Sequence, residues 1–133
     1  NLEAKGVNIK GTILKPNMVL AGQSSISQLS HDEVADLTMK CLKENVPAEL
    51  PGIAFLSGGQ SDLDATANLD ALNKKGGNPW KLTFSYGRAL QQAALKAWMG
   101  DKANTQSAQD AFSHRAEMNK LAALGQWDKR LEG

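Results

Sequence analysis

The chain has 133 residues, of which 41% are hydrophobic and 22% charged, and its 15 basic and 14 acidic residues leave a formal net charge of +1. Because these charges are interspersed and form no block, the composition argues against a protein that binds nucleic acid or an anionic membrane. No segment approaches the roughly 18 apolar residues of a membrane span, so one globular domain over residues 1–133 is expected.

Cysteine usage and the first residues favour a cytoplasmic location. The single cysteine, Cys41, cannot form a disulfide within the chain, and the chain does not open with the basic and apolar pattern of a signal peptide. Such features fit a reducing compartment. Val34, Ala35, Leu37, Thr38 and Cys41 recur at the spacing of one helix face, which predicts a buried, packed thiol.

The first half of the chain predicts two strands with a helix between them. A strand candidate covers residues 7–14 and stops before Pro16, because proline has no backbone donor. The sequence Ser-His-Asp-Glu at residues 30–33 has the capping-box pattern and begins a helix that reaches about Asn45. A short apolar strand at residues 53–56 then runs directly into a Ser-Gly-Gly-Gln loop.

The second half predicts a helix, a third strand and two further helices. Ser61 can cap a helix that ends at the glycine pair 76–77. A strand candidate at residues 82–85 is followed by Tyr-Gly-Arg and a helix to about Met99. A last amphipathic helix runs from about residue 104 to residue 124.

Strands that alternate with helices predict an α/β fold whose parallel strands are joined by right-handed crossovers. The carboxyl ends of such strands share one edge, so Lys15, residues 57–59 and residues 87–88 should lie together, where α/β folds and barrels bind ligands. Three strands cannot close an eight-stranded (β/α)8 barrel, which takes roughly 250 residues. Either the sheet is open, or part of a barrel is absent from this chain.

Lys15 places a primary amine where an apolar strand meets a loop. Burial there would disfavour the ammonium form, and a neutral amine can attack a ketone. The resulting iminium withdraws electrons from the neighbouring carbon–carbon bond, so a lysine can support aldol cleavage without a metal. A lone lysine at a strand end is, however, more commonly a side chain that extends into solvent.

Two other segments suit a phosphate group. Residues 57–59 supply a hydroxyl and flexible backbone amides after a strand, although paired glycines also form ordinary turns. Residues 86–88 precede a helix, whose free amides and positive dipole end attract an anion. Arg88 can add charge-assisted hydrogen bonds there, whereas a solvated arginine at this position would oppose the dipole.

The sequence GTILKPNMV at residues 11–19 resembles, nearly residue for residue, the Schiff-base lysine signature of class I fructose-bisphosphate aldolases. Residues 55–61 (FLSGGQS) and 82–90 (LTFSYGRAL) are similar to the substrate-phosphate loops of that family, and residues 94–98 (ALKAW) continue the match. The resemblance covers residues 6–124.

This resemblance implies the C-terminal part of a (β/α)8 barrel enzyme that reversibly cleaves fructose 1,6-bisphosphate to dihydroxyacetone phosphate and glyceraldehyde 3-phosphate. It also implies a homo-tetramer, with the N-terminal strands of the barrel absent from this chain. Lys15 would form the Schiff base. The expected phosphate-binding residues are Leu56, Ser57, Gly58, Gly59, Tyr86, Gly87 and Arg88.

The chain shows no obvious acid or base for the proton transfers, because no Asp or Glu falls at the end of a predicted strand. By resemblance, these groups and the residues for the second phosphate belong to the missing strands. A partial barrel that binds phosphate, or pairs with its missing half, without turnover is therefore an alternative, since an incomplete sheet exposes unpaired backbone groups.

Cofactor requirements follow from the residues that the sequence offers. Pyridoxal phosphate is a further alternative, because it also needs a lysine imine and a phosphate cup. His31 and His114 fall in predicted helices without metal-ligand spacing, and no cysteine and histidine cluster suggests zinc. We therefore expect neither a metal nor a cofactor.

Overall fold

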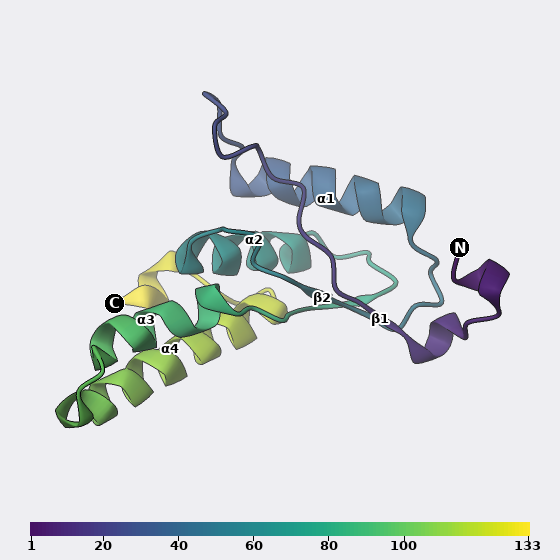
Figure 1. The fold of residues 1–133 in the computed structure, drawn as a ribbon. Helices are drawn as coiled ribbons and strands as arrows, with labels where there is room; N and C mark the ends of the chain where they lie inside the picture. The colour runs from purple at the N-terminus through teal and green to yellow at the C-terminus, as the bar shows by residue number, and fades with distance from the viewer.

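A computed structural model describes all 133 residues and shows a three-stranded parallel sheet with four α-helices (Figure 1). The strands are β1 (Ile13–Leu14), β2 (Gly52–Phe55) and β3 (Lys81–Phe84), in the spatial order β1-β2-β3. The helices are α1 (His31–Asn45), α2 (Asp62–Lys75), α3 (Arg88–Trp98) and α4 (Thr105–Ala123). The predicted α/β order with parallel strands is therefore confirmed.

The predicted starts of α1 and α2 are confirmed, and at each of them a serine side chain satisfies a free backbone amide. At the start of α1, Ser30 Oγ accepts a hydrogen bond from Glu33 N (3.3 Å), and the Glu33 carboxylate accepts one from Ser30 N (2.8 Å). Ser61 Oγ accepts from Asp64 N (3.0 Å) at the start of α2. The left-handed φ of 54° at Met99 ends α3 just before Gly100.

The first strand is shorter than predicted. Only Ile13–Leu14 is extended and paired, while residues 9–11 form a turn of 3₁₀ helix. The side chain of Asn8 accepts a hydrogen bond from Lys10 N (3.1 Å), and Thr12 Oγ1 donates to Ile9 O (2.9 Å). These local bonds compete with strand pairing, which explains why the strand starts late.

The prediction of a buried thiol is wrong, because Cys41 is exposed. Val34, Ala35 and Thr38 are buried as expected, but Leu37 is 41% exposed. The buried face of α1 continues through Met39 and Leu42, whereas the face assumed from the sequence ran through Leu37 and Cys41. The two faces differ by one residue position around the helix.

The two faces of the sheet differ. Ile53 and Phe55 of β2 have no exposed surface, and Leu82 of β3 is 5% exposed, so this face forms the core beneath the helices. Side chains alternate along a strand, and those of the other face are open. On it, Ile13 is 67% exposed and Thr83 is exposed.

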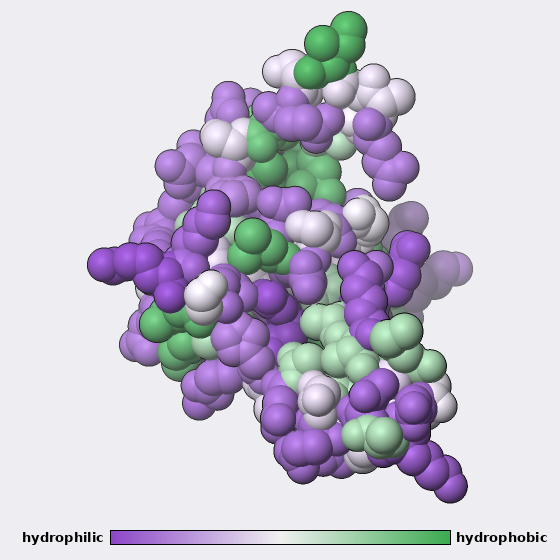
Figure 2. Space-filling model, turned by 90° about the vertical axis from the view of Figure 1, so that its left-hand side faces the viewer, coloured by the Kyte–Doolittle hydropathy of each residue, from purple (hydrophilic) through white to green (hydrophobic).

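The helices form a continuous layer. α2 packs on both α1 and α4, and α3 and α4 form an antiparallel pair (Figure 1). Figure 2 shows a largely hydrophilic surface with a paler, apolar area low in the view, on the side where α3 and α4 meet. The exposed apolar side chains of this helix pair are Leu95, Trp98, Met99 and Phe112.

A long connection leads from β1 to α1 and crosses the face of α1 (Figure 1). Val19 N donates a hydrogen bond to Thr38 Oγ1 in the middle of that helix (2.9 Å), which holds the connection in place. None of the helices combines the length and the apolar character that a membrane crossing requires.

Candidate active site

The sheet ladder continues beyond the strands and brings three predicted segments to one edge. Leu56 N donates to Pro16 O (3.0 Å), and Ser85 N donates to Phe55 O (2.7 Å). Together with the register Leu14↔Ile53 and Phe55↔Phe84, these bonds place residues 15–17, 56–58 and 85–87 side by side. This edge is the carboxyl end of the parallel sheet, as the sequence predicted.

Lys15 emerges on the open face of the sheet. The register pairs Leu14 with Ile53, whose side chain faces the helices, so the alternation of side chains directs Lys15 to the opposite face. Its side chain is exposed and makes no hydrogen bond or ion pair with the chain. The amine is therefore free, and the apolar enclosure expected around it is not formed by these residues.

The glycine loop after β2 is a tight turn. Gly58 and Gly59 have φ angles of 57° and 82°, and Gln60 N donates to Ser57 O (3.0 Å). Two consecutive residues with positive φ are typical of a type I′ turn, which glycine adopts without steric cost. Both glycines are exposed and Ser57 is half-buried, so the loop presents a hydroxyl and backbone amides at the sheet edge.

The N-terminus of α3 lies at the same edge. Gly87 precedes the first residue of this helix, Arg88, and no side chain caps the free backbone amides. The first amides of a helix have no partner within it, and with the helix dipole they form an anion-binding position. Arg88 is exposed and makes no ion pair within the chain, so its guanidinium is available to an anion.

Tyr86 differs from its neighbours, because its side chain points into the core. It is 5% exposed, its hydroxyl donates to Ala65 O (2.8 Å), and its ring centroid lies 5.5 Å from that of Phe84. Burial raises the pKa of the Tyr86 hydroxyl well above its usual value. Only the backbone of Tyr86 is therefore left to meet a ligand at the sheet edge.

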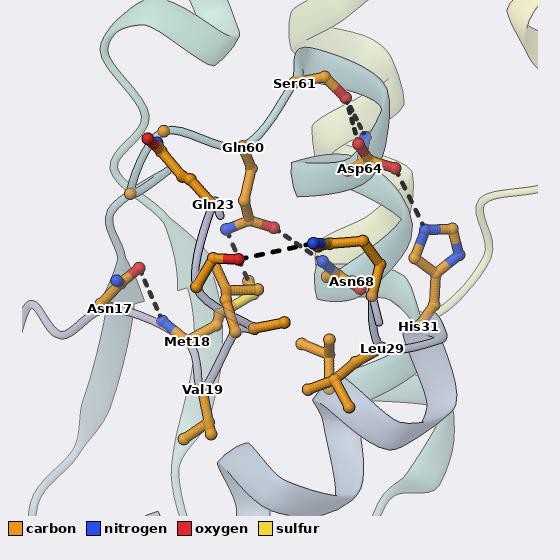
Figure 3. Close-up of a pocket in the computed structure, with 17 residues that line it drawn as sticks. Asn17, Met18, Val19, Gln23, Leu29, His31, Gln60, Ser61, Asp64 and Asn68 are labelled. Carbon is orange, nitrogen blue, oxygen red and sulfur yellow. Dashed lines mark hydrogen bonds and ion pairs between the residues drawn. The ribbon is translucent and has the colours of Figure 1, made fainter. Parts of the chain in front are cut away.

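Three amide side chains, Asn17, Gln60 and Asn68, had no predicted role; in Figure 3, Gln60 and Asn68 lie next to each other and Asn17 lies apart from them. They line a cavity of about 670 Å³ beneath the connection from β1 to α1, and Gly58 and Gly59 form part of its wall. Lys15 and Arg88 do not line this cavity. No sequence pattern signals these contacts, since they join segments that are distant along the chain.

Both histidines lie on the surface, away from the sheet edge. His31 Nε2 lies 3.4 Å from Asp64 Oδ1 and His114 Nε2 lies 3.5 Å from Glu132 Oε2, with both histidines about half exposed. The structure contains no group of three or more His, Cys, Asp or Glu side chains placed to hold a metal ion.

Comparison with known proteins identifies a family and several relatives. The family model described as fructose-bisphosphate aldolase class-I matches residues 1–133. Fructose-bisphosphate aldolase 2 of Caenorhabditis elegans is 56% identical over 122 residues, which are 91% of this chain and 33% of that protein. Fructose-bisphosphate aldolase 4, cytosolic, of Arabidopsis thaliana is 52% identical over 120 residues, which are 90% of this chain and 30% of that protein.

A solved structure has the same fold. Fructose-bisphosphate aldolase from Plasmodium falciparum, in complex with TRAP and a small molecule inhibitor, superposes with a TM-score of 0.92 at 46% identity. The match covers 96% of this chain and 37% of that one, so the chain spans about a third of the length of these relatives. Since the family model matches every residue, the chain belongs to the class I fructose-bisphosphate aldolase family.

Proposed function

We propose that the protein carrying this chain is a class I fructose-bisphosphate aldolase, which reversibly cleaves fructose 1,6-bisphosphate to dihydroxyacetone phosphate and glyceraldehyde 3-phosphate. The observation that carries this proposal is the position of Lys15, on the open face of the sheet and at the same edge as the glycine loop and the uncapped N-terminus of α3. The names of the relatives support the same reaction.

Lys15 would act as the nucleophile. Its neutral Nζ adds to the ketone carbon of the substrate, and the carbinolamine then loses water to form an iminium. When a base removes the proton from the C4 hydroxyl, the C3–C4 bond breaks, its electrons form an enamine, and the aldehyde leaves. Protonation of the enamine and addition of water release the ketose phosphate and restore the lysine.

The phosphate nearest the reacting carbonyl would bind between the glycine loop and the start of α3. The Ser57 hydroxyl and the amides of Gly58 and Gly59 would contact it from one side, with Leu56 contributing through its backbone. The amide of Gly87 and the amide and guanidinium of Arg88 would contact it from the other. Tyr86 would contribute its backbone alone.

The uncovered face of the sheet supports a larger assembly around these residues. Parallel sheets are normally covered on both faces, yet Ile13 and Thr83 lie open here. We propose that the chain is the C-terminal part of a (β/α)8 barrel whose other strands enclose Lys15. Those strands would supply the acid and base groups and the residues for the second phosphate.

Self-association and location are part of the same proposal. The apolar side chains exposed on α3 and α4 support contact with further protein surface, and we propose a homo-tetramer, which sedimentation of the full-length protein would test. The word cytosolic in the name of the Arabidopsis relative supports a cytoplasmic enzyme.

The test is borohydride reduction in the presence of dihydroxyacetone phosphate, followed by intact mass and peptide mapping of the full-length protein. A reduced adduct on Lys15 is expected, and Lys15→Met should abolish it. Lys10→Met is the matched control, because Lys10 is an exposed lysine ahead of β1. Wild-type protein without an adduct would overturn the proposal, and an imine absorbance band before substrate is added would indicate pyridoxal phosphate instead.

The same measurement on residues 1–133 alone, a chain of 14.3 kDa, tests whether this chain forms the imine by itself or is a non-catalytic part of the barrel. An adduct on this chain would show that the imine chemistry needs no other strand. Phosphate binding without an adduct would show that the chain binds its ligand but depends on the rest of the barrel for chemistry.

A further inference from the structure

The segment that carries Lys15 runs directly beside the glycine loop. Asn17 lies two residues after Lys15, and the carbonyl of the intervening Pro16 accepts the hydrogen bond from Leu56 N (3.0 Å). This backbone bond continues the β1–β2 pairing beyond the strands, and the side chain of Asn17 provides the next contact between the two segments.

The Asn17 amide fills the space beside Gly58 that a side chain would need. A Cβ atom on Gly58 would lie 2.7 Å from Asn17 Cγ and 2.9 Å from its Nδ2, and closer still to its Oδ1. Gly59 shows the same relation to Gln23, whose Nε2 would lie 3.0 Å from an added Cβ. Two side chains of the loop after Lys15 therefore pack directly against the backbone of the glycine pair.

The side chain of Asn17 is held by the next residue, Met18, which in turn contacts Gln60. Its Oδ1 accepts a hydrogen bond from Met18 N (3.0 Å), and the Met18 side chain is 3% exposed. Gln60 Nε2 contacts the Met18 sulfur at 3.8 Å, and Gln60 Oε1 accepts from Asn68 Nδ2 at 2.7 Å (Figure 3). Because Gln60 directly follows Gly59, this row of contacts starts beside Gly58, returns to the glycine loop at Gln60 and ends at Asn68 in α2.

We propose that Asn17 is a positioning residue that couples the phosphate-binding loop to the amine of Lys15. The inference rests on the proposed aldolase function. Phosphate bound at residues 57–59 sets the position of that loop, and the Asn17 contact passes this position to the segment that carries Lys15. The ketone carbon and the Lys15 Nζ then meet in the reactive geometry. A displacement of about 1 Å from this geometry can slow the reaction roughly 100-fold.

The experiment compares imine formation with and without a phosphate on the substrate. In full-length protein, the rate of borohydride-trapped adduct on Lys15 is measured with dihydroxyacetone phosphate and with dihydroxyacetone, which has the same ketone. Their ratio reports how much the bound phosphate accelerates the reaction. Asn17→Ala should lower this ratio by about 10-fold to 100-fold while the dihydroxyacetone rate stays within about twofold.

Two further variants make the comparison specific. Asn8→Ala is the matched control, because Asn8 Oδ1 also accepts a nearby backbone N–H (Lys10 N, 3.1 Å) but lies ahead of β1; its ratio should match wild type. Asn17→Ser keeps an oxygen near Met18 N and lacks the amide that rests on Gly58. Its ratio should also fall, which keeps the test informative should Asn17→Ala prove too unstable to assay.

The outcomes separate this inference from the function on which it rests. A wild-type ratio in the Asn17 variants, or an equal loss of rate with both compounds, would overturn the positioning role and leave the aldolase proposal standing. Wild-type protein that forms no adduct on Lys15 would instead overturn the aldolase proposal itself.

Discussion

Glu132→Gln should release the C-terminal end of the chain from α4. The Glu132 carboxylate accepts hydrogen bonds from Arg115 Nη1 (3.0 Å) and Nη2 (2.8 Å) and from Trp127 Nε1 (2.8 Å). Arg115 is 7% exposed, and without this carboxylate it keeps only Thr66 Oγ1 at 3.2 Å and Asp62 at 3.9 Å. Glutamine preserves the shape of the side chain and removes its charge.

The size of the effect follows from the burial of the pair. Removing one partner of a buried ion pair costs about 3–5 kcal/mol, because the other charge is left uncompensated. The side chains of Arg115 and Glu132 are 9% and 15% exposed, and Asp62 still offsets part of the charge. We therefore expect local opening of the C-terminal segment to become easier by about 2–3 kcal/mol.

Limited trypsin digestion of the full-length protein measures this opening, because Lys129 and Arg130 lie in the segment that Glu132 holds. When opening is fast relative to cleavage, the cleavage rate follows the open population. The variant should be cut about 30-fold to 150-fold faster than wild type. Glu117→Gln, which loses only an exposed pair with Lys120, is the control and should stay within about threefold. A wild-type rate in Glu132→Gln would refute the reasoning.

The same contact should weaken in acid. Burial raises the pKa of Glu132, but the hydrogen bonds from Arg115 and Trp127 outweigh it and hold the pKa below the ordinary value of 4.5. A carboxyl group whose pKa is lower in the folded chain than in the unfolded chain stabilises the fold when the pH is above its unfolded pKa. This stabilisation is lost as the pH falls through the folded pKa. The fluorine NMR signal of 5-fluorotryptophan at position 127 should therefore distinguish wild type from Glu132→Gln at neutral pH, and this difference should shrink below pH 4.5.

Three further substitutions test the assignments at the sheet edge. Tyr86→Phe should lower the free energy of unfolding by about 1 kcal/mol, because it loses one hydrogen bond to Ala65 O, and should leave the KM for fructose 1,6-bisphosphate unchanged; a higher KM would place the hydroxyl at the substrate. Arg88→Lys keeps the charge but not the paired donors, so steady-state kinetics should show a KM raised about 10-fold, and an unchanged KM would remove Arg88 from the phosphate site. Thr38→Val leaves Val19 N without its acceptor, which should cost about 1–3 kcal/mol and speed amide exchange over residues 16–29 relative to wild type; unchanged exchange would contradict it.

Features with local causes could be predicted from the sequence alone. The start of α1 depends on Ser30 and Glu33, three residues apart, and the start of α2 depends on Ser61 and the amide of Asp64. The alternation of strands and helices likewise follows from the periodicity of apolar residues. The position of Lys15 at a strand end was also predictable, because the next residue, Pro16, has no backbone N–H to donate.

Side-chain directions required the tertiary structure. The hydroxyl of Tyr86 bonds Ala65, 21 residues away, and that contact turns its ring into the core and leaves only its backbone at the sheet edge. The exposure of Cys41 depends on which face of α1 packs against the rest of the chain, and a buried face assumed one residue away assigns the thiol to the wrong side. The contact between Asn17 and Gly58 joins residues 41 positions apart, so it exists only once β1 and β2 are paired. Local hydrogen bonds and apolar spacing depend on residues that are close in the sequence. The contact of one loop with another depends on the packing of segments that meet only in the folded chain.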